Sequence, residues 1–236
     1  MLAVCLIHFV IANLFNTQTH LNWARYSITL LAVKKSMVRR RQQNTSQKKP
    51  SGGFVRIISG SWRGRKLPVH DLEGLRPTID RVKETLFNWV AQDIPHSTCL
   101  DVFAGSGGLG FEAASRQAKM VTLLEMNQKA AKQLSDNAKE LKADNINVVN
   151  TDAISFLKQP GTPYDMVFLD PPFRKGLLAE TVQLLESNGW LADNAIIYVE
   201  TEKELKLEAM PDNWELHRDK TTGQSSYRLF NRITEE

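Results

Sequence analysis

Between residues 98 and 200, short continuous hydrophobic runs alternate with segments whose apolar residues recur every three or four positions. Five of the runs have the length and composition of buried strands: TCLDVFA (98–104), MVTLLE (120–125), INVVN (146–150), YDMVFLD (164–170) and AIIYVE (195–200). The segments between them predict helices over residues 109–116, 127–141, 153–157 and 177–185. Strands that alternate with helices predict an α/β fold with a mostly parallel, doubly wound sheet.

Weaker strand patterns flank this core at both ends. Residues 214–218 and 226–230 predict an antiparallel hairpin that closes the sheet. On the other side, residues 54–58 and 62–69 surround a glycine-containing turn and predict a small β-hairpin. Thr78 then caps a predicted helix that reaches about Ala91, with one apolar face.

The first 53 residues have a different character. Residues 1–15 are apolar but lack the basic start and the small-residue cleavage site of a signal peptide. They are also fewer than the roughly 20 residues that a membrane-spanning helix needs. Met37 opens a polar and basic segment, so we hypothesise that residues 1–36 reflect a start codon assigned too early or a disordered extension. The predicted organisation is then a flexible basic arm (37–53), a small N-terminal β-hairpin (54–73) and a main α/β domain (74–232).

Composition narrows the class of protein. The two cysteines, Cys5 and Cys99, form no CxxC pair, which argues against a disulfide framework or a structural zinc and favours a reducing, cytoplasmic compartment. Fifteen of the 30 Lys and Arg residues fall between residues 25 and 92, against four of the 26 Asp and Glu residues. Because this basic bias continues past the arm into segments predicted to fold, it favours a partner with a phosphate backbone.

A glycine-rich turn follows the first strand of the core. Gly105, Gly107 and Gly110 give the spacing G-x-G-x-x-G, which permits a tight turn and close approach of a ligand to the start of a helix. Glu125 ends the next strand, where a carboxylate can accept hydrogen bonds from both hydroxyls of a ribose. Asp152 follows the third strand and fits two readings equally: an acceptor for an adenine amine, or the N-cap of a short helix. These features suit dehydrogenases and methyltransferases alike.

The fourth strand ends in Asp170-Pro171-Pro172-Phe173, which distinguishes between these classes. Two prolines hold the chain extended and remove two N–H donors, so that a carboxylate and backbone carbonyls remain beside an aromatic ring. Such a site binds an amine and stacks on a flat ring, as expected of an amino-group methyltransferase. A nicotinamide dehydrogenase would leave this motif unexplained, and a non-catalytic RNA-binding module would not need it.

Reading outward from this motif, the chain resembles one family over roughly residues 54–231. The segments that carry the likeness are RIISGSWRGRKL (56–67), GLRPTIDRVKETLFNW (74–89), DVFAGSGGLGFEAASR (101–116), LDPPF (169–173), NGWL (188–191) and GQSSYRLF (223–230). They are similar to the RsmD family of bacterial 16S rRNA guanine-N2 methyltransferases. Two departures are Asn127, where the family often has an acid, and Lys83, where it usually has arginine.

The resemblance implies a Rossmann-like, class I fold with a seven-stranded sheet, and S-adenosylmethionine as the cofactor. It implies methylation of N2 of guanine 966 in 16S rRNA within small-subunit (30S) particles or their precursors. Apart from the resemblance, we expect a monomer without membrane association. The expected catalytic residues are Asp170, Pro171, Pro172 and Phe173. The expected cofactor-binding residues are Arg76, Thr78, Asp101, Phe103, Gly105, Ser106, Gly107, Gly110, Glu125 and Asp152, and no metal site is expected. From the charge pattern, the expected RNA-binding residues are Arg56, Arg63, Arg65, Lys66 and Arg81.

Related chemistries remain as alternatives. Enzymes that methylate adenine N6 in DNA, or N5 of a protein glutamine, share the cofactor turn and the proline motif. They more often have Asn in place of Asp170, and they lack the basic segments before the main domain.

Overall fold

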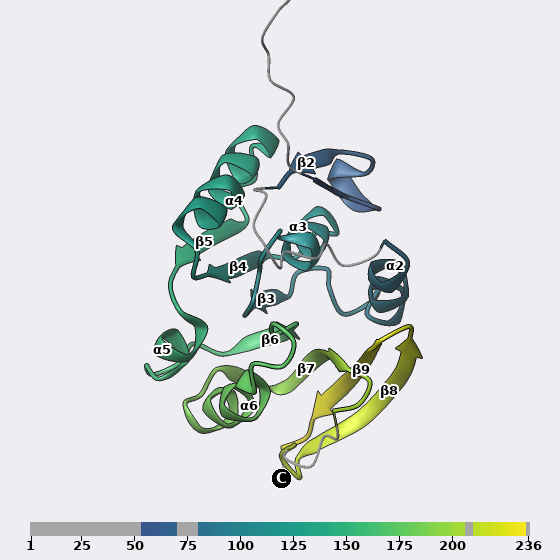
Figure 1. Ribbon diagram of the computed structural model, residues 1–236, viewed down its shortest axis with the longest axis vertical. Helices are drawn as coiled ribbons and strands as arrows, with labels where there is room; N and C mark the ends of the chain where they lie inside the picture. The colour runs from purple at the N-terminus through teal and green to yellow at the C-terminus, as the bar shows by residue number, and fades with distance from the viewer. Residues whose placement is uncertain (1–52, 70–79, 206–209, 235–236) are drawn as a thin grey trace, which may run out of the picture. The chain divides into compact units, whose positions relative to one another are not determined.

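A seven-stranded sheet forms the centre of the protein (Figure 1). The computed structural model describes residues 53–69, 80–205 and 210–234. The sheet order is β5-β4-β3-β6-β7-β9-β8, in which the first five strands run parallel and β9 is antiparallel to both of its neighbours. The predicted doubly wound sheet with a closing hairpin is therefore confirmed.

The element boundaries agree closely with the hydrophobic pattern. The strands are β1 (Phe54–Arg56), β2 (Lys66–Pro68), β3 (Thr98–Asp101), β4 (Met120–Glu125), β5 (Ile146–Asn150), β6 (Tyr164–Leu169), β7 (Leu191–Glu202), β8 (Trp214–Thr222) and β9 (Ser225–Arg232). The helices are α2 (Asp80–Trp89), α3 (Gly108–Ser115), α4 (Gln128–Leu141), α5 (Ala153–Leu157) and α6 (Leu177–Ser187), with a 3-10 turn η1 (Gly60–Trp62) between β1 and β2.

Local signals explain where several of these helices begin. Asn127 caps α4 as expected, because its side-chain oxygen accepts from the N–H groups of Lys129 (3.0 Å) and Ala130 (3.2 Å). Helix α2 begins at Asp80 and buries Val82, Leu86 and Phe87 against the core. The predicted cap of this helix, Thr78, lies outside the described residues.

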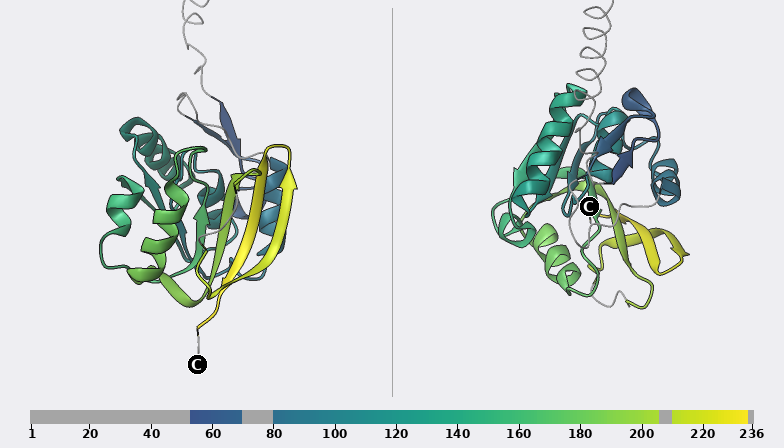
Figure 2. Two further views of the ribbon diagram at one scale, coloured as in Figure 1. Left: turned by 60° about the horizontal axis from the view of Figure 1, so that its bottom comes forward. Right: turned by 45° about the horizontal axis from the view of Figure 1, so that its top comes forward.

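Helices cover both faces of the sheet (Figures 1 and 2). One hydrophobic core lies between the sheet and α2, α3 and α4, and contains Phe87, Phe111, Phe168 and Tyr198. The other lies between the opposite face and α5 and α6. Among the described residues, no helix combines the length and the apolar character that a membrane crossing requires.

The predicted N-terminal hairpin is confirmed for its described part, in which β1 pairs with β2 in antiparallel register. Several predicted segments differ in length from the observed strands. Strand β3 ends at Asp101, three residues earlier than expected, because the chain turns there toward the glycines. Strand β7 begins four residues earlier and ends two residues later than AIIYVE, and β8 and β9 are also longer than their apolar patterns.

Candidate active site

The carboxyl ends of β3, β4 and β6 bring the predicted site together. Strand β3 lies at the centre of the parallel part, with β4 on one side and β6 on the other. The chain leaves β3 toward α3 on one face of the sheet, so that a crevice is expected where the strand order reverses. The glycine turn, Glu125 and Asp170 all follow these strands.

The glycine turn has the conformation that its sequence predicted. Gly105 (φ 52°) and Gly107 (φ 78°) both adopt the left-handed region, which favours glycine. Gly110 has another role: a Cβ added there would lie 2.0 Å from a methyl carbon of Leu123 on β4. Helix α3 therefore packs directly on the sheet. It begins at Gly108, after an N-cap residue, Gly107, that has no side chain to cap it, so the N–H groups of Gly108 and Leu109 are left for a ligand.

Asp101 lies beneath this turn. Its side chain is 2% exposed, and one carboxylate oxygen accepts from the backbone N–H of Gly110 at 3.0 Å. Burial raises the pKa of Asp101 to about 7; the bond from Gly110 opposes this shift, and the charge of Glu125 adds to it. The contact fixes α3 on β3, which gives Asp101 a direct part in shaping the turn. Of its predicted neighbours in the turn, Ser106 is buried and Phe103 is partly buried.

Glu125 connects the second strand to the same turn. Its carboxylate accepts from the backbone N–H of Asn127 at 2.7 Å and also from the backbone N–H of Gly105. Partial burial raises the pKa of Glu125, whereas these two hydrogen bonds lower it. The predicted ribose acceptor and the glycine turn are thus in direct contact.

Asp152 caps α5, since its carboxylate accepts from the backbone N–H of Ser155 at 2.8 Å. The N-cap reading is therefore confirmed. The cofactor reading stays a prediction, because Asp152 is exposed after β5, the strand beside β4.

The Asp170–Phe173 motif follows β6 directly. Asp170 and Phe173 are partly buried, Pro171 is buried and Pro172 is exposed. Burial raises the pKa of Asp170 well above its usual range, and the charges of Glu200 and Asp101 raise it further. A carboxyl group with a raised pKa binds a proton more readily at neutral pH than an ordinary aspartate does.

Glu200, which the sequence analysis did not single out, is a neighbour of this motif. Phe168 of β6 pairs with Tyr198 of β7, so Asp170 and Glu200, each two residues further on, share one face of the sheet. The Tyr198 hydroxyl donates to the Glu200 carboxylate at 3.0 Å, and both side chains are buried. The sequence did contain a signal for Glu200, because the predicted strand IIYVE ends in an acid. If that strand is placed beside the one that ends at the proline motif, Glu200 lies next to Asp170.

By the same register, four carboxylates face one side of the sheet at its carboxyl edge. Asp101 pairs with Leu123 on one side and with Phe168 on the other. Glu125 and Asp170 each come two residues after these partners, so they lie on the same face as Asp101 and closer to the carboxyl edge. The row therefore runs Glu125, Asp101, Asp170 and Glu200 across four adjacent strands. Such a row accepts hydrogen bonds and favours positively charged or amine-bearing ligands.

The N-terminal hairpin is fastened to α3. Buried Glu112 accepts from the backbone N–H groups of Ile58 (2.7 Å) and Ser59 (3.0 Å). Ser115, one turn further on, donates to the Ser59 carbonyl at 2.6 Å and accepts from the Trp62 N–H at 3.0 Å. The helix that begins at the glycine turn thus also positions the basic hairpin.

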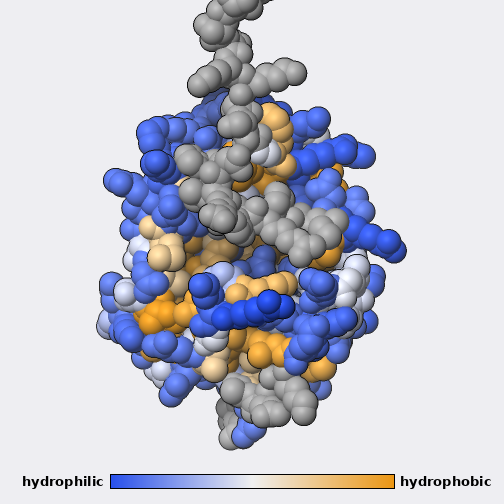
Figure 3. Space-filling model, viewed as in Figure 1, coloured by the Kyte–Doolittle hydropathy of each residue, from blue (hydrophilic) through white to orange (hydrophobic). Residues whose placement is uncertain are grey.

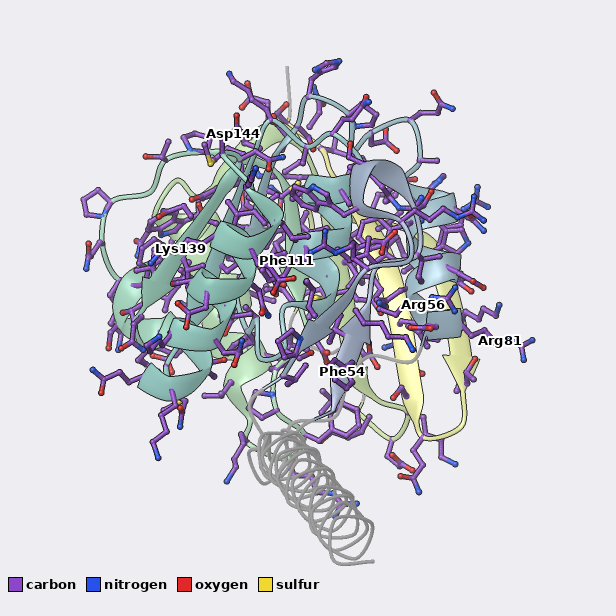
Figure 4. All side chains as sticks on the ribbon, turned by 90° about the horizontal axis from the view of Figure 1, so that it is seen from above. Phe54, Arg56, Arg81, Phe111, Lys139 and Asp144 are labelled. Atoms are coloured by element: carbon purple, nitrogen blue, oxygen red, sulfur yellow. The ribbon has the colours of Figure 1, made fainter. Side chains whose placement is uncertain are left out.

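The predicted RNA-binding side chains on this hairpin are all exposed. Arg56 and Lys66 lie directly opposite each other on β1 and β2. Arg65 differs from the others because it forms an ion pair with Glu140 of α4, at 2.7 Å. Figure 4 shows Arg56 and Arg81 extending from β1 and α2 on the same side of the molecule. Arg76 lies outside the described residues.

Lys83 joins the hairpin to α2. It is 1% exposed, donates to the Arg56 carbonyl at 2.6 Å and lies 3.6 Å from Asp80. Burial lowers the pKa of Lys83, and the charges of Glu112 and Asp80 oppose that shift. The side chain therefore has a structural position inside the protein.

Comparisons with known proteins agree with these observations. The profile of a family described as "Conserved hypothetical protein 95" matches residues 55–231. The "Ribosomal RNA small subunit methyltransferase D" of Escherichia coli is 60% identical over 188 residues, which cover 78% of this chain and 95% of that protein. The Haemophilus influenzae protein of the same name is 57% identical over 182 residues, covering 75% and 94%.

Two solved structures of similar proteins have the same fold. A putative methyltransferase from Escherichia coli superposes with a TM-score of 0.74 at 57% identity, over 78% of this chain and all of the other. A putative methylase from Haemophilus influenzae gives a TM-score of 0.68 at 53% identity, over 77% of this chain and all of the other.

Proposed function

The chain belongs to the RsmD family of ribosomal RNA methyltransferases, and from this premise we propose that it methylates the exocyclic N2 of one guanine in 16S rRNA. The fold is that of the class I methyltransferases, and rRNA methylation follows from the family. The atom, the position (guanine 966), the 30S particle as substrate, and a cytoplasmic monomer as the active form are parts of the proposal.

The observation that carries the proposal is the position of the proline motif. Asp170–Phe173 leaves the sheet directly beside the strand that ends in the glycine turn. A methyl donor held at that turn and an amine held at the motif would meet at the carboxyl edge of adjacent strands.

The residues on the donor side fit S-adenosylmethionine. Two glycines with positive φ open the turn, Gly107 at the N-cap of α3 has no side chain to cap the helix, and Glu125 is fixed at the end of β4. When bound, this cofactor supplies a methyl group that its sulfonium charge already activates. The chain therefore needs no nucleophile of its own, and Cys99, which is buried at the start of β3, takes no part.

The side of the site that would bind the base offers mainly hydrogen-bond acceptors. The Asp170 carboxylate and the Pro171 carbonyl are suited to the two N–H bonds of an amine, and Pro171 and Pro172 provide no N–H donors. A guanine presents only donors at N1 and N2, whereas adenine presents an acceptor at N1. A site rich in acceptors, with Glu200 near Asp170, therefore favours guanine.

Phe173 and Asp170 then have distinct parts in the reaction. Phe173 stacks on the extruded base and excludes water from it. Asp170 draws the N2 hydrogens toward itself, which makes the nitrogen lone pair available to the methyl group. When the nitrogen becomes positively charged on methylation, Asp170 can accept the proton that it loses, because the raised pKa matches that task.

The test uses small ribosomal subunits from an Escherichia coli strain that lacks its own small subunit methyltransferase D. The subunits are incubated with this protein and S-adenosylmethionine, and the digested rRNA is analysed by mass spectrometry of its nucleosides. Appearance of one N2-methylguanosine per subunit supports the proposal. Methylation of another base, of DNA or of protein contradicts the assigned substrate, and absence of any methylation contradicts the reaction.

A further inference from the structure

The short loop after Phe173 has an unusual backbone. Arg174 has a positive φ of 61°, a region that residues with a side chain rarely adopt, and Gly176 follows with φ 66° before α6 begins. The backbone N–H of Arg174 donates to the carboxylate of Glu202 at the end of β7. This contact fixes the strained residue against the neighbouring strand, and such strain often marks a functional position.

The same loop carries two adjacent cations. Arg174 and Lys175 are exposed, and in the described part of the chain neither side chain lies within ion-pairing distance of an acid. Some other exposed cations, such as Lys132 and Lys158, have carboxylate partners. Two positive charges therefore point into solvent immediately beyond the proposed base-binding motif.

The surrounding segments place the loop on the acceptor side of the site. Glu202 pairs with Ser225 across β7 and β9, and the backbone N–H of Lys203 donates to the Gln224 carbonyl at 3.0 Å. The 170–176 loop, the end of β7 and the β8–β9 turn therefore meet at the carboxyl edge of the sheet. The glycine turn and Glu125 lie on the other side of Asp170, across β3.

We propose that Arg174 and Lys175 bind the phosphodiester groups that flank the nucleotide whose base enters the Asp170–Phe173 motif. A base can reach this motif only if its own sugar and phosphates stay outside, at the rim where these cations lie. Glu202 is a positioning residue in this arrangement, since it fixes the backbone from which Arg174 extends. The inference rests on the proposed function, because it takes RNA as the substrate.

Figure 3 shows one face of the molecule, on which strongly hydrophilic residues lie beside apolar patches. In the proposed arrangement, Asp170 would contact the base of one nucleotide, and the cations of the loop would contact the phosphates that flank it.

The test compares two double variants. Arg174→Asn with Lys175→Gln removes both charges, and asparagine tolerates the left-handed backbone. Lys142→Asn with Lys119→Gln is the matched control: Lys142 also has a positive φ (54°), and both lysines are exposed and unpaired among the described residues. Lys119 precedes β4 and Lys142 follows α4, at the opposite edge of the sheet.

Binding of a fluorescein-labelled 16S rRNA transcript is measured by anisotropy over a series of salt concentrations. The 174/175 variant should bind at least about tenfold more weakly, and its slope of log Kd against log salt should fall by more than one unit, because each phosphate bound by the protein contributes roughly 0.7–0.9. Its affinity for S-adenosylmethionine should stay unchanged. Equal RNA binding and slopes in the two double variants would overturn the proposal. The binding assay needs no turnover. Its result therefore tests the role of Arg174 and Lys175 independently of whether the methylation test succeeds.

Two variants of Glu202 then separate positioning from charge. Glu202→Ala removes both the acceptor for Arg174 and a negative charge, whereas Glu202→Gln keeps an acceptor oxygen. Weaker RNA binding by Glu202→Ala, with recovery in Glu202→Gln, supports the positioning role. Tighter RNA binding by both variants would show that Glu202 only repels phosphate, and would overturn that role.

Discussion

Asp170 and Glu200 lie at equivalent places on two paired strands, each one residue beyond the partners Leu169 and Val199. The charge of Glu200 raises the pKa of Asp170, and the Tyr198 hydroxyl fixes Glu200 from below. The pKa of the carboxyl group in the proline motif therefore depends on a residue that lies 30 positions further along the chain.

Replacing Asp170 should stop the reaction without releasing the cofactor. Asp170→Ala removes an acceptor for the amine and for its proton, so we expect kcat to fall at least about 100-fold. Affinity for S-adenosylmethionine, measured by calorimetry, should change little. Asp144→Ala, which removes an exposed acid distant from the site, serves as the control (Figure 4). Wild-type turnover by the Asp170 variant would remove this residue from the mechanism.

Replacing Glu200 should change the pH dependence of the rate. Glu200→Gln removes a negative charge that raises the pKa of Asp170, so that pKa should fall. Because the ionised Asp170 accepts the proton, the acidic limb of the rate profile should move to lower pH. Asp193→Asn, at the exposed start of the same strand, should leave the profile in place. An unmoved limb in Glu200→Gln would show that Asp170 does not govern it.

Asp101 should make the fold less stable as pH rises. Its pKa is about 7 in the folded protein against an ordinary value of 3.8, so the folded state binds the proton more tightly. That stabilisation is complete below about pH 4 and is lost as pH rises through about 7. Asp101→Asn keeps an acceptor for the Gly110 N–H but does not ionise. Urea denaturation should therefore show the wild type losing stability relative to this variant between these pH values; parallel curves would contradict the prediction.

Gly110 should not tolerate a side chain. The added Cβ of Gly110→Ala would lie 2.0 Å from Leu123, and overpacking of this kind costs about 1–3 kcal/mol of unfolding free energy. Gly108→Ala is the control, because the nearest atom to its Cβ would be 3.8 Å away. A shorter residue at 123 should partly rescue the first variant in the same denaturation assay.

The hairpin cations should contribute unequally to RNA binding. Arg63→Ala with Lys66→Ala should weaken binding of the 16S transcript and reduce the salt slope by roughly 0.7–0.9 for each phosphate that the variant no longer binds. Arg65→Ala should have a smaller effect, because Glu140 already neutralises Arg65 in the free protein. An unchanged slope in the double variant would place the RNA on another face.

Sequence periodicity predicted most of this fold because each core strand is a continuous apolar run. β4, β5 and α5 were predicted with their observed boundaries. β7 was predicted too short because Leu191–Asn194 is not apolar enough to mark a buried strand. The sheet buries only part of that segment, and hydrogen bonds to its neighbours extend it.

The sequence alone identified those residues of the proposed site that belong to contiguous motifs. The glycine turn, Glu125 and the proline motif can be recognised in the sequence, and the fold brings them to one edge of the sheet. Glu200 and Glu202 could not be identified in the same way, since their proximity to Asp170 and Arg174 depends on strand register. Pairing of Arg65 with Glu140 likewise joins residues 75 positions apart.

Helix α3 holds the glycine turn and the basic hairpin at a fixed distance from each other. Its first residue adjoins the proposed methyl donor, and its side chains at positions 112 and 115 fasten the loop of the basic hairpin. If the hairpin binds RNA and the glycine turn holds the methyl donor, as proposed, the span between the bound RNA backbone and the methyl group is set by the length of this one rigid helix. A nucleotide at the wrong distance from the gripped backbone would fall short of the donor or overshoot it, so that target choice becomes in part a measurement of length.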